Sequence, residues 1–245
     1  MKSIQTLFGI IPILALLGCG NPADKVPAAS VNKPSGAAKE GSGASDAAGR
    51  YFATKPDSST IEFVGSKVTR SHNGGFKNFA GEFKIVNGRV ADTGNKIVID
   101  ASSLWADDNR LTGHLKSPDF FNIAQFPTAT FVSTSVTSAD NGSKVTGDLT
   151  LHGVTKSITF PAKIQVSESA VDVTAEFAIN RVDFEIKYPG MANDLIRNEV
   201  VLKLNVKAAP GRADFKSLEQ AAQTGAAAAP PAMRMGGPQR PKPGQ

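Results

Sequence analysis

Apolar and polar residues alternate through most of the chain between residues 51 and 207. In one such stretch the apolar positions are Ile158, Phe160, Ala162, Ile164 and Val166, and polar side chains occupy most positions between them. A period of two over five or more residues is typical of a β-strand with one buried and one solvated face. The same reasoning predicts eight strands, at residues 60–68, 79–87, 96–101, 128–136, 144–152, 158–166, 171–180 and 200–207.

Short turn signals separate these strands. The pairs Asn87-Gly88, Asn141-Gly142 and His152-Gly153 accept the positive φ angles that tight hairpins need. Strands joined largely by short turns imply an antiparallel meander, which must bury its apolar face by closing or by stacking on a second sheet. We predict an all-β fold, an antiparallel eight-stranded barrel, with a sandwich as the alternative. Such a barrel either fills its interior with side chains or holds one small ligand.

One segment, residues 104–126, breaks the strand pattern. Ser117 followed by Pro118 is the arrangement of an N-cap and a first helical residue, so we expect one or two short helices here. Phe120, Phe121 and Phe126 are too apolar for an exposed loop. The segment is therefore expected to form a short helical cap on the barrel.

The two ends of the chain differ from its middle. Residues 1–18 have the early lysine and short apolar run of a signal peptide, and Gly18 before Cys19 resembles the lipobox of bacterial lipoproteins, in which the cysteine is acylated. Residues 19–50 are rich in Gly, Ala, Ser and Pro, which predicts a flexible linker. Residues 208–245 are expected to be a basic, low-complexity and mostly disordered tail, with a short helix near 214–223.

Charge and cysteine content narrow the function. The chain has 245 residues and a formal net charge of +5, but residues 51–207 contain seventeen basic and seventeen acidic residues. A neutral folded domain lacks the basic surface that nucleic acids require, so we expect no nucleic-acid partner. The single cysteine excludes an internal disulfide and a multi-cysteine metal site.

Three motifs carry a resemblance to a known family. They are Gly113-His114-Leu115-Lys116-Ser117-Pro118-Asp119-Phe120-Phe121-Asn122, Phe126-Pro127-Thr128-Ala129-Thr130-Phe131 and Val145-Thr146-Gly147-Asp148-Leu149-Thr150-Leu151-His152-Gly153-Val154-Thr155-Lys156. In this order they resemble the YceI-like family of periplasmic, lipocalin-shaped proteins that bind polyisoprenoid lipids. The resemblance covers about residues 51–207. It implies a barrel around an elongated apolar tunnel that holds an isoprenoid or quinone-like chain, with no cofactor and no catalytic activity.

Two departures from the family pattern concern the mouth of that tunnel. The family usually has a histidine after its Asp-Pro pair, whereas residues 56–59 read Pro-Asp-Ser-Ser. The family's Asp-Phe-Gly-Ile appears as Asp-Phe-Glu-Ile at residues 183–186, which replaces a glycine that allows close backbone approach. Both departures leave the head group of the ligand undetermined.

Motifs for catalysis are largely absent, including Gly-x-Ser-x-Gly, His-Glu-x-x-His and the phosphate-binding Gly-x-x-x-x-Gly-Lys. His72, His114 and His152 could together bind a divalent metal, but none are spaced for local chelation. We favour histidines that hydrogen-bond the backbone at turns and in the cap. Asp107 and Asp108 fit helix-capping groups better than a general acid and base pair. We therefore expect neither an enzyme nor a metal site.

The candidate ligand site is a set of apolar side chains with a few polar groups. It comprises Phe63, Phe83, Phe120, Phe121, Phe131, Leu149, Phe160, Phe177, Phe184 and Leu204, with Arg110, His114 and Tyr188 as mouth groups that orient a head group. For each phenylalanine, ordinary core packing is the competing interpretation. Fourteen phenylalanines against two tyrosines and one tryptophan nevertheless favour an apolar lumen.

These observations predict a membrane-tethered protein, acylated at Cys19, that holds one polyisoprenoid or quinone-like lipid for transport, storage or stress protection. Its expected location is the cell envelope, facing the periplasm, on the outer membrane if the source is Gram-negative. One alternative is a filled-core structural or interaction module of the envelope, and a second is a His-based metal site. The sequence leaves a homodimer open.

Overall fold

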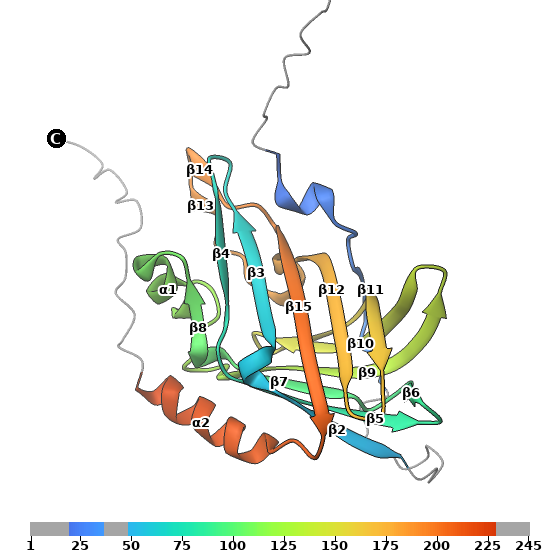
Figure 1. Ribbon diagram of the computed structural model, residues 1–245. Helices are drawn as coiled ribbons and strands as arrows, with labels where there is room; N and C mark the ends of the chain where they lie inside the picture. The colour runs from blue at the N-terminus through green and yellow to red at the C-terminus, as the bar shows by residue number, and fades with distance from the viewer. Residues whose placement is uncertain (1–19, 37–48, 229–245) are drawn as a thin grey trace, which may run out of the picture.

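The computed structural model of the protein describes residues 20–36 and 49–228 (Figure 1). Its strands are β1 (Ser30–Asn32), β2 (Arg50–Thr54), β3 (Thr60–Ser66), β4 (Ser71–Phe76), β5 (Phe79–Val86), β6 (Arg89–Val90), β7 (Lys96–Asp100), β8 (Leu104–Ala106), β9 (Thr128–Ala139), β10 (Gly142–Leu151), β11 (Val154–Val166), β12 (Val171–Asn180), β13 (Gly190–Met191), β14 (Asp194–Leu195) and β15 (Glu199–Pro210). Its helices are η1 (Pro22–Lys25), η2 (Pro56–Ser58), η3 (Ala101–Ser103), η4 (Arg181–Phe184), α1 (Asn109–Lys116) and α2 (Phe215–Ala227).

The main sheet closes into an antiparallel barrel of eight strands. Three of these barrel strands are interrupted: β2 continues into β3 past η2, β4 into β5, and β7 into β8 past η3. The others are β9, β10, β11, β12 and β15. Closure is made at β15, which pairs with β2 and β3 along one edge and with β12 along the other. The predicted fold class is confirmed, and each predicted strand belongs to one of the eight.

The barrel wall is incomplete between β11 and β12. Their pairing runs only from Val166↔Val171 to Lys163↔Thr174. Extending the same register would place Pro161 opposite Glu176, but proline has no N–H to donate and interrupts a sheet ladder. Beyond this point the two strands separate, and a surface recess lies between residues 161–163 and 174–176.

The N-terminal segment fills the opening between these strands. β1 pairs with β11 through Val31↔Ile158 and its two neighbours. On the other side Ala29 N–H donates to the Ala178 carbonyl at 2.8 Å, and Ala178 N–H donates to the Pro27 carbonyl at 2.9 Å. The side chains of Ala29 and Val31 pack against the apolar cluster inside the barrel. Residues 27–32 therefore complete the wall where Pro161 interrupts it.

The prediction of a flexible linker over residues 19–50 is thus wrong for residues 21–35. Asn21 is buried and accepts a hydrogen bond from Ser66 Oγ at 3.3 Å. At the other end of the segment, Ser35 N–H and Oγ both donate to Asp148 Oδ1 at 3.1 Å. The content of small residues concealed an apolar pair, Ala29 and Val31, that alternates as a strand requires. The signal peptide 1–18, Cys19 and residues 37–48 lie outside the described residues.

The cap contains one α-helix, which begins after the predicted capping pair Asp107 and Asp108 and not at Ser117. Asp108 is the N-cap of α1 and accepts from Leu111 N–H at 2.8 Å, as expected for a capping carboxylate. Ser117 is the C-cap of α1 rather than the start of a second helix. Pro118 and the residues after it form turns. The N-cap role predicted for Ser117 is therefore wrong, because α1 starts upstream at Asp108 and ends before Pro118.

The segment after the barrel is also more ordered than expected. α2 extends to Ala227, with Asp214 as its N-cap, and the side chains of Ala222 and Ala226 are buried. The helix contacts β7 and η3 and runs along one side of the barrel (Figure 1). The prediction of a disordered tail is therefore wrong for residues 208–228, and residues 229–245 lie outside the described part. No helix of the described part has the length and apolar character needed to cross a membrane.

Candidate functional site

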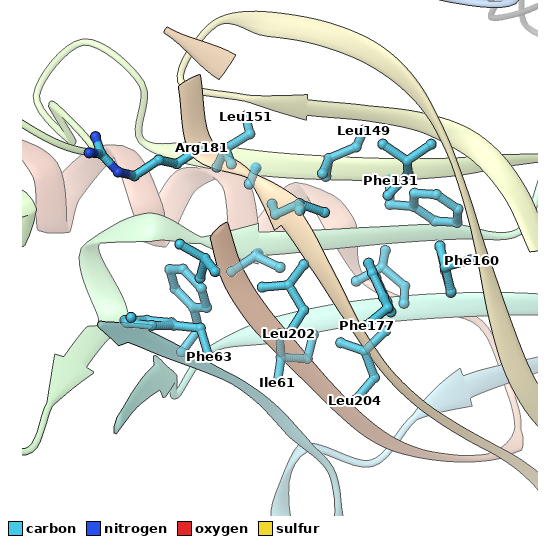
Figure 2. A pocket seen from close by; sticks show the side chains of 18 of the residues that line it. Ile61, Phe63, Phe131, Leu149, Leu151, Phe160, Phe177, Arg181, Leu202 and Leu204 are labelled. Carbon is cyan, nitrogen blue, oxygen red and sulfur yellow. The ribbon is translucent and has the colours of Figure 1, made fainter. Parts of the chain in front are cut away.

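An apolar cavity of ≈ 240 Å³ occupies the inside of the barrel. Every one of the eight barrel strands contributes side chains to it, and Leu111, Leu115, Phe120 and Phe121 of the cap close over it. Figure 2 shows aliphatic and aromatic side chains converging from opposite walls along its length, with Arg181 at one end. The period of two in each strand produces this lining, since alternate side chains point to the same face.

Aromatic rings form one stretch of the wall. Phe160 and Phe177 are stacked, with ring centroids 4.1 Å apart and planes 11° from parallel. Phe131 lies tilted against Phe160 at 5.7 Å. Phe160 and Phe177 face each other across the separating strands β11 and β12, so they bridge the inside of the opening that the N-terminal segment covers. The wall here offers flat apolar surface to a ligand.

Two glycines make room for lumen phenylalanines. A Cβ atom at Gly147 would lie 2.3 Å from Phe131 Cζ, and one at Gly74 would lie 2.3 Å from Phe63 Cζ. Each ring therefore packs directly on the backbone of the neighbouring strand. Gly147 also sits at a register shift between β9 and β10, where the strand bends. These glycines place the two rings along the cavity wall.

The end of the cavity near Asn95 and Ser133 is polar but internally satisfied. Asn95 Nδ2 donates to Ser133 Oγ at 2.9 Å and to the Ala91 carbonyl at 2.6 Å, and Asn95 Oδ1 accepts from Lys84 N–H at 3.1 Å. Both residues are buried. Because their groups bond one another, this end closes the cavity and leaves little capacity for a ligand head group.

The opposite end, which we call the mouth, contains a buried arginine. Arg181 is 5% exposed. Its guanidinium donates to the carbonyl oxygens of Ile186 at 2.6 Å, Arg197 at 3.1 Å and Ile196 at 3.3 Å, and to Asn198 Oδ1 at 3.4 Å. Burial lowers the pKa of Arg181, and Glu199 partly offsets this effect, but a guanidinium stays protonated in proteins. The mouth therefore holds a positive charge bonded to uncharged oxygens.

Other polar residues of the mouth are partly exposed. Lys67 and Arg197 line the cavity, and Lys67 Nζ lies 3.2 Å from Asp194 Oδ2. His72 Nδ1 lies 2.8 Å from Asp107 Oδ1. Desolvation raises the pKa of Asp107, but hydrogen bonds from Asn73 N–H and the His72 ring outweigh it, so the net effect lowers the pKa. The mouth thus combines the basic groups of Arg181, Lys67 and Arg197 and the ring of His72 with two nearby carboxylates, at one end of an apolar cavity.

The chain is similar in sequence to proteins of a known family. The model of the YceI-like domain matches residues 52–208. The chain belongs to the YceI-like family. It is 35% identical to a UPF0312 protein of Pseudomonas putida over 131 residues, which cover 51% of this chain and 68% of that protein. It is 39% identical to a UPF0312 protein of Vibrio parahaemolyticus over 112 residues, 45% of this chain and 59% of that protein.

Solved structures agree on the fold. The chain is similar to Burkholderia cenocepacia BcnA, with a TM-score of 0.57 and 24% identity, over 64% of this chain and 99% of that one. It is also similar to a polyisoprenoid binding domain from Saccharophagus degradans, with a TM-score of 0.53 and 19% identity, over 66% of this chain and 99% of that one. At these identities the similarity shows the barrel fold of the YceI-like family.

Most of the predicted site residues line the cavity of this YceI-like barrel. They are Phe63, Phe83, Phe120, Phe121, Phe131, Leu149, Phe160, Phe177 and Leu204. Strand alternation was the signal that found them, since each lies on the apolar face of its strand or in the cap. Their part in binding a ligand stays a prediction.

The other four predicted residues lie elsewhere. Arg110 is exposed on α1. Phe184 is fully buried in the apolar cluster inside the barrel, but its own side chain does not line the cavity. His114 packs edge-on against Phe120 and Tyr188, at 4.9 and 5.0 Å, and its Nε2 lies 3.0 Å from Asp119 Oδ2. His114 and Tyr188 therefore support the cap behind Phe120 rather than face the lumen.

Sequence reasoning missed the polar mouth. Arg181, Lys67, His72 and Arg197 line the cavity. Lys67 shares the alternation of Ile61 and Phe63 in the predicted strand at residues 60–68, but it is charged and so was not part of the apolar set. The other three lie outside the predicted strands. Many aliphatic liners were also missed, among them Ile61, Leu151, Ile179, Val200 and Leu202. Their positions follow the same alternation as the predicted phenylalanines, so the apolar face of each strand is the signal that finds them.

The two family departures do not reach the cavity. Residues 56–58 form η2 between β2 and β3 and are exposed. Glu185 is exposed, forms an ion pair with Lys187, and has φ of 61°. A glycine at this position serves the left-handed turn after η4, rather than the close backbone approach that we expected. Neither change therefore alters the tunnel.

The three histidines have separate partners. His72 pairs with Asp107, His114 with Asp119, and His152 Nδ1 lies 3.2 Å from the Phe184 carbonyl. Only His152 matches the expected contact with the backbone. Within residues 20–36 and 49–228 no three His, Cys, Asp or Glu residues gather in a group able to hold a metal ion.

Proposed function

We propose that this protein binds a long apolar lipid, of polyisoprenoid or quinone-like type, inside its barrel, and does so as a binding protein rather than an enzyme. The observation that carries the proposal is the continuous apolar cavity lined by all eight strands. The polyisoprenoid binding domain from Saccharophagus degradans, which has the same fold, supports the choice of ligand class. Burial of apolar surface, at about 25 cal/mol per Å², would drive binding.

The proposal includes attachment to a membrane. Acylation of Cys19 after removal of residues 1–18 would anchor the chain in the cell envelope, facing the periplasm, and on the outer membrane in a Gram-negative cell. The lipobox-like sequence ending in Cys19 supports this. A lipid-anchored protein with an apolar cavity is suited to carry or store a membrane lipid.

Lipid mass spectrometry tests the ligand. The full chain is purified from native cells without detergent and extracted with organic solvent. We expect an isoprenoid in stoichiometric amount. The variant Leu149→Trp, which fills the lumen beside Phe131, should lose most of this lipid. Lys144→Trp places the same side chain on an exposed position of the same strand and should retain it.

The outcomes separate the proposal from its alternative. Repeated recovery of a folded but lipid-free barrel would contradict lipid binding and favour a structural or interaction module of the envelope. Equal lipid loss in Leu149→Trp and Lys144→Trp would place the lipid outside the lumen.

A further inference from the structure

Three large apolar side chains of the described residues are exposed, and all three lie at the mouth end of the barrel. Val68 is 57% exposed, Met191 65% and Leu195 50%. They belong to two adjacent loops: the β3–β4 turn, residues 67–70, and the β13–β14 hairpin with Ile196 and Arg197. We call these two loops the rim. Figure 1 shows both at the same end of the molecule.

The rim is one continuous surface, because hydrogen bonds join its two loops. Val68 N–H donates to the Leu195 carbonyl at 3.2 Å. Thr69 Oγ1 donates to Asp194 Oδ1 at 2.9 Å, and Lys67 Nζ lies 3.2 Å from Asp194 Oδ2. The loops are therefore held together with their apolar side chains outward. Lys67, Ile196 and Arg197 also line the cavity, so the rim borders the mouth.

The charge of the rim is positive. Its two loops contain three basic residues, Lys67, Arg70 and Arg197, and one acidic residue, Asp194. Asp194 is paired with Lys67, while Arg70 is exposed. Exposed apolar side chains beside basic groups fit the interface of an anionic bilayer, where the apolar groups insert and the basic groups meet the head groups.

The N-terminus of the described chain lies at the same place. Asn21 accepts a hydrogen bond from Ser66 Oγ at 3.3 Å, and Ser66 directly precedes the rim. Cys19 is two residues before Asn21, and two residues span at most about 7 Å. A lipid on Cys19 would thus enter the bilayer beside the rim. A flexible linker of residues 19–50 would have allowed any orientation, but the docking of residues 21–35 restricts it.

We infer that the rim docks on the surface of the membrane that anchors the chain, with the mouth of the tunnel facing the bilayer. This inference rests on the proposed function and adds the orientation and the contact surface. Val68, Met191 and Leu195 insert among the head groups, and Arg70 contacts anionic lipid. A bound isoprenoid then passes between bilayer and tunnel without exposing its chain to water.

Orientation is tested in the acylated full chain. Asn193→Cys, at the tip of the hairpin, and Ser169→Cys, in the turn at the opposite end of β12, are each labelled with an environment-sensitive thiol dye. Vesicles of phosphatidylethanolamine and phosphatidylglycerol are the membrane. We expect a blue-shifted emission, quenched by lipid-borne quenchers, at residue 193 and water-like emission at residue 169. Water-like emission at both residues, or a blue shift at residue 169, overturns the inference.

Binding by the rim is tested without the anchor, in the mature chain of residues 19–245 with Cys19→Ser, since the apolar run of the signal peptide would itself bind vesicles. Arg70→Glu should weaken binding to phosphatidylglycerol vesicles about tenfold or more, whereas Arg89→Glu, an exposed residue of the β5–β6 hairpin, should not. The triple variant Val68→Ser, Met191→Ser and Leu195→Ser should weaken binding about tenfold or more. Because these side chains are exposed, the thermal midpoint of each variant should equal that of the parent chain.

Equal binding by Arg70→Glu and Arg89→Glu overturns the inference. The inference is also overturned if the dye at residue 193 becomes shielded from water as the protein concentration rises in the absence of vesicles, since a second copy of the chain would then cover the rim. The lipid content of these variants, measured as above, distinguishes the two proposals. If the rim variants contain isoprenoid and bind vesicles as well as the parent chain does, lipid binding stands and docking by the rim is rejected. If the parent chain contains no lipid, the proposed function is rejected.

Discussion

Glu185 adopts a left-handed backbone conformation directly after η4, with φ of 61° and ψ of 15°. This conformation costs an L-residue with a Cβ atom roughly 1–2 kcal/mol, and glycine avoids that cost at the expense of a more flexible unfolded chain. Glu185→Gly should therefore raise the free energy of unfolding by about 0.5–1 kcal/mol, even though it removes the ion pair with Lys187. Urea unfolding measures the change.

Glu185→Ala is the control for the lost carboxylate. It also removes the ion pair but keeps the Cβ atom, so it should not stabilise the protein. If the two variants were equally stable, the backbone conformation would not be the cause.

The contact between His72 and Asp107 joins β4 to the start of the cap. The pKa of Asp107 is lowered from 3.8 by hydrogen bonds that outweigh desolvation. A carboxyl group with a depressed pKa in the folded state stabilises the fold above its unfolded pKa, and this stabilisation is lost as pH falls through the folded pKa. We expect up to ~1 kcal/mol, as for an exposed pair, to disappear below about pH 4.

The measurement is the free energy of unfolding at pH 5 and at successively lower pH, for the parent chain and for Asp107→Asn. The parent should lose stability more steeply below about pH 4 than the variant does. Parallel curves would show that this contact contributes nothing to the acid sensitivity.

At the scale of elements, the N-terminal segment acts as a wall piece of the barrel. Ala29→Pro removes the N–H that donates to the Ala178 carbonyl and leaves that carbonyl without its partner. The expected loss of unfolding free energy is about 1–2 kcal/mol, with faster hydrogen exchange at the Ala178 amide. Unfolding measurements combined with hydrogen exchange test both effects.

Ala28→Pro makes the same chemical change one residue earlier, where the N–H takes no part in the two bonds with Ala178. It should have a smaller effect on both quantities. An unchanged Ala178 exchange rate in Ala29→Pro would mean that residues 27–32 do not hold β12 in place.

At the scale of the whole molecule, the cavity predicts a dependence on the length of the ligand. Each buried CH₂ group contributes about 0.8 kcal/mol, so prenyl alcohols of increasing length should bind more tightly until they fill the tunnel. A ligand that binds only the folded state raises the thermal midpoint. Midpoints measured with a series of prenyl alcohols should rise with chain length and then level off. A midpoint independent of length would contradict a tunnel that takes the chain lengthwise.

The sequence by itself determined the all-β fold with its eight strands, and most of the site residues it predicted line the cavity. Alternation along each strand is a local property, and a strand with one apolar face must turn that face inward, so the eight barrel strands and residues such as Phe131 and Phe177 could be predicted. The capping pair Asp107 and Asp108 likewise indicated the start of α1 at Asn109, although Ser117 and Pro118 offered a second start that the fold does not use. The breaks within three barrel strands could not be predicted, because alternation within a strand does not show where the chain leaves the ladder.

Only the tertiary structure decided which residues fill the opening between β11 and β12 and which residues form the mouth of the cavity. Ser35 meets Asp148 across 113 residues of sequence, and Asn21 meets Ser66 across 45, so no local pattern reveals that the N-terminal segment completes the wall. Arg181 lies at the mouth because its guanidinium donates hydrogen bonds to the carbonyl oxygens of Ile196 and Arg197, which follow β14 in the chain. Such contacts depend on the closure of the barrel, which brings together residues that the sequence keeps far apart.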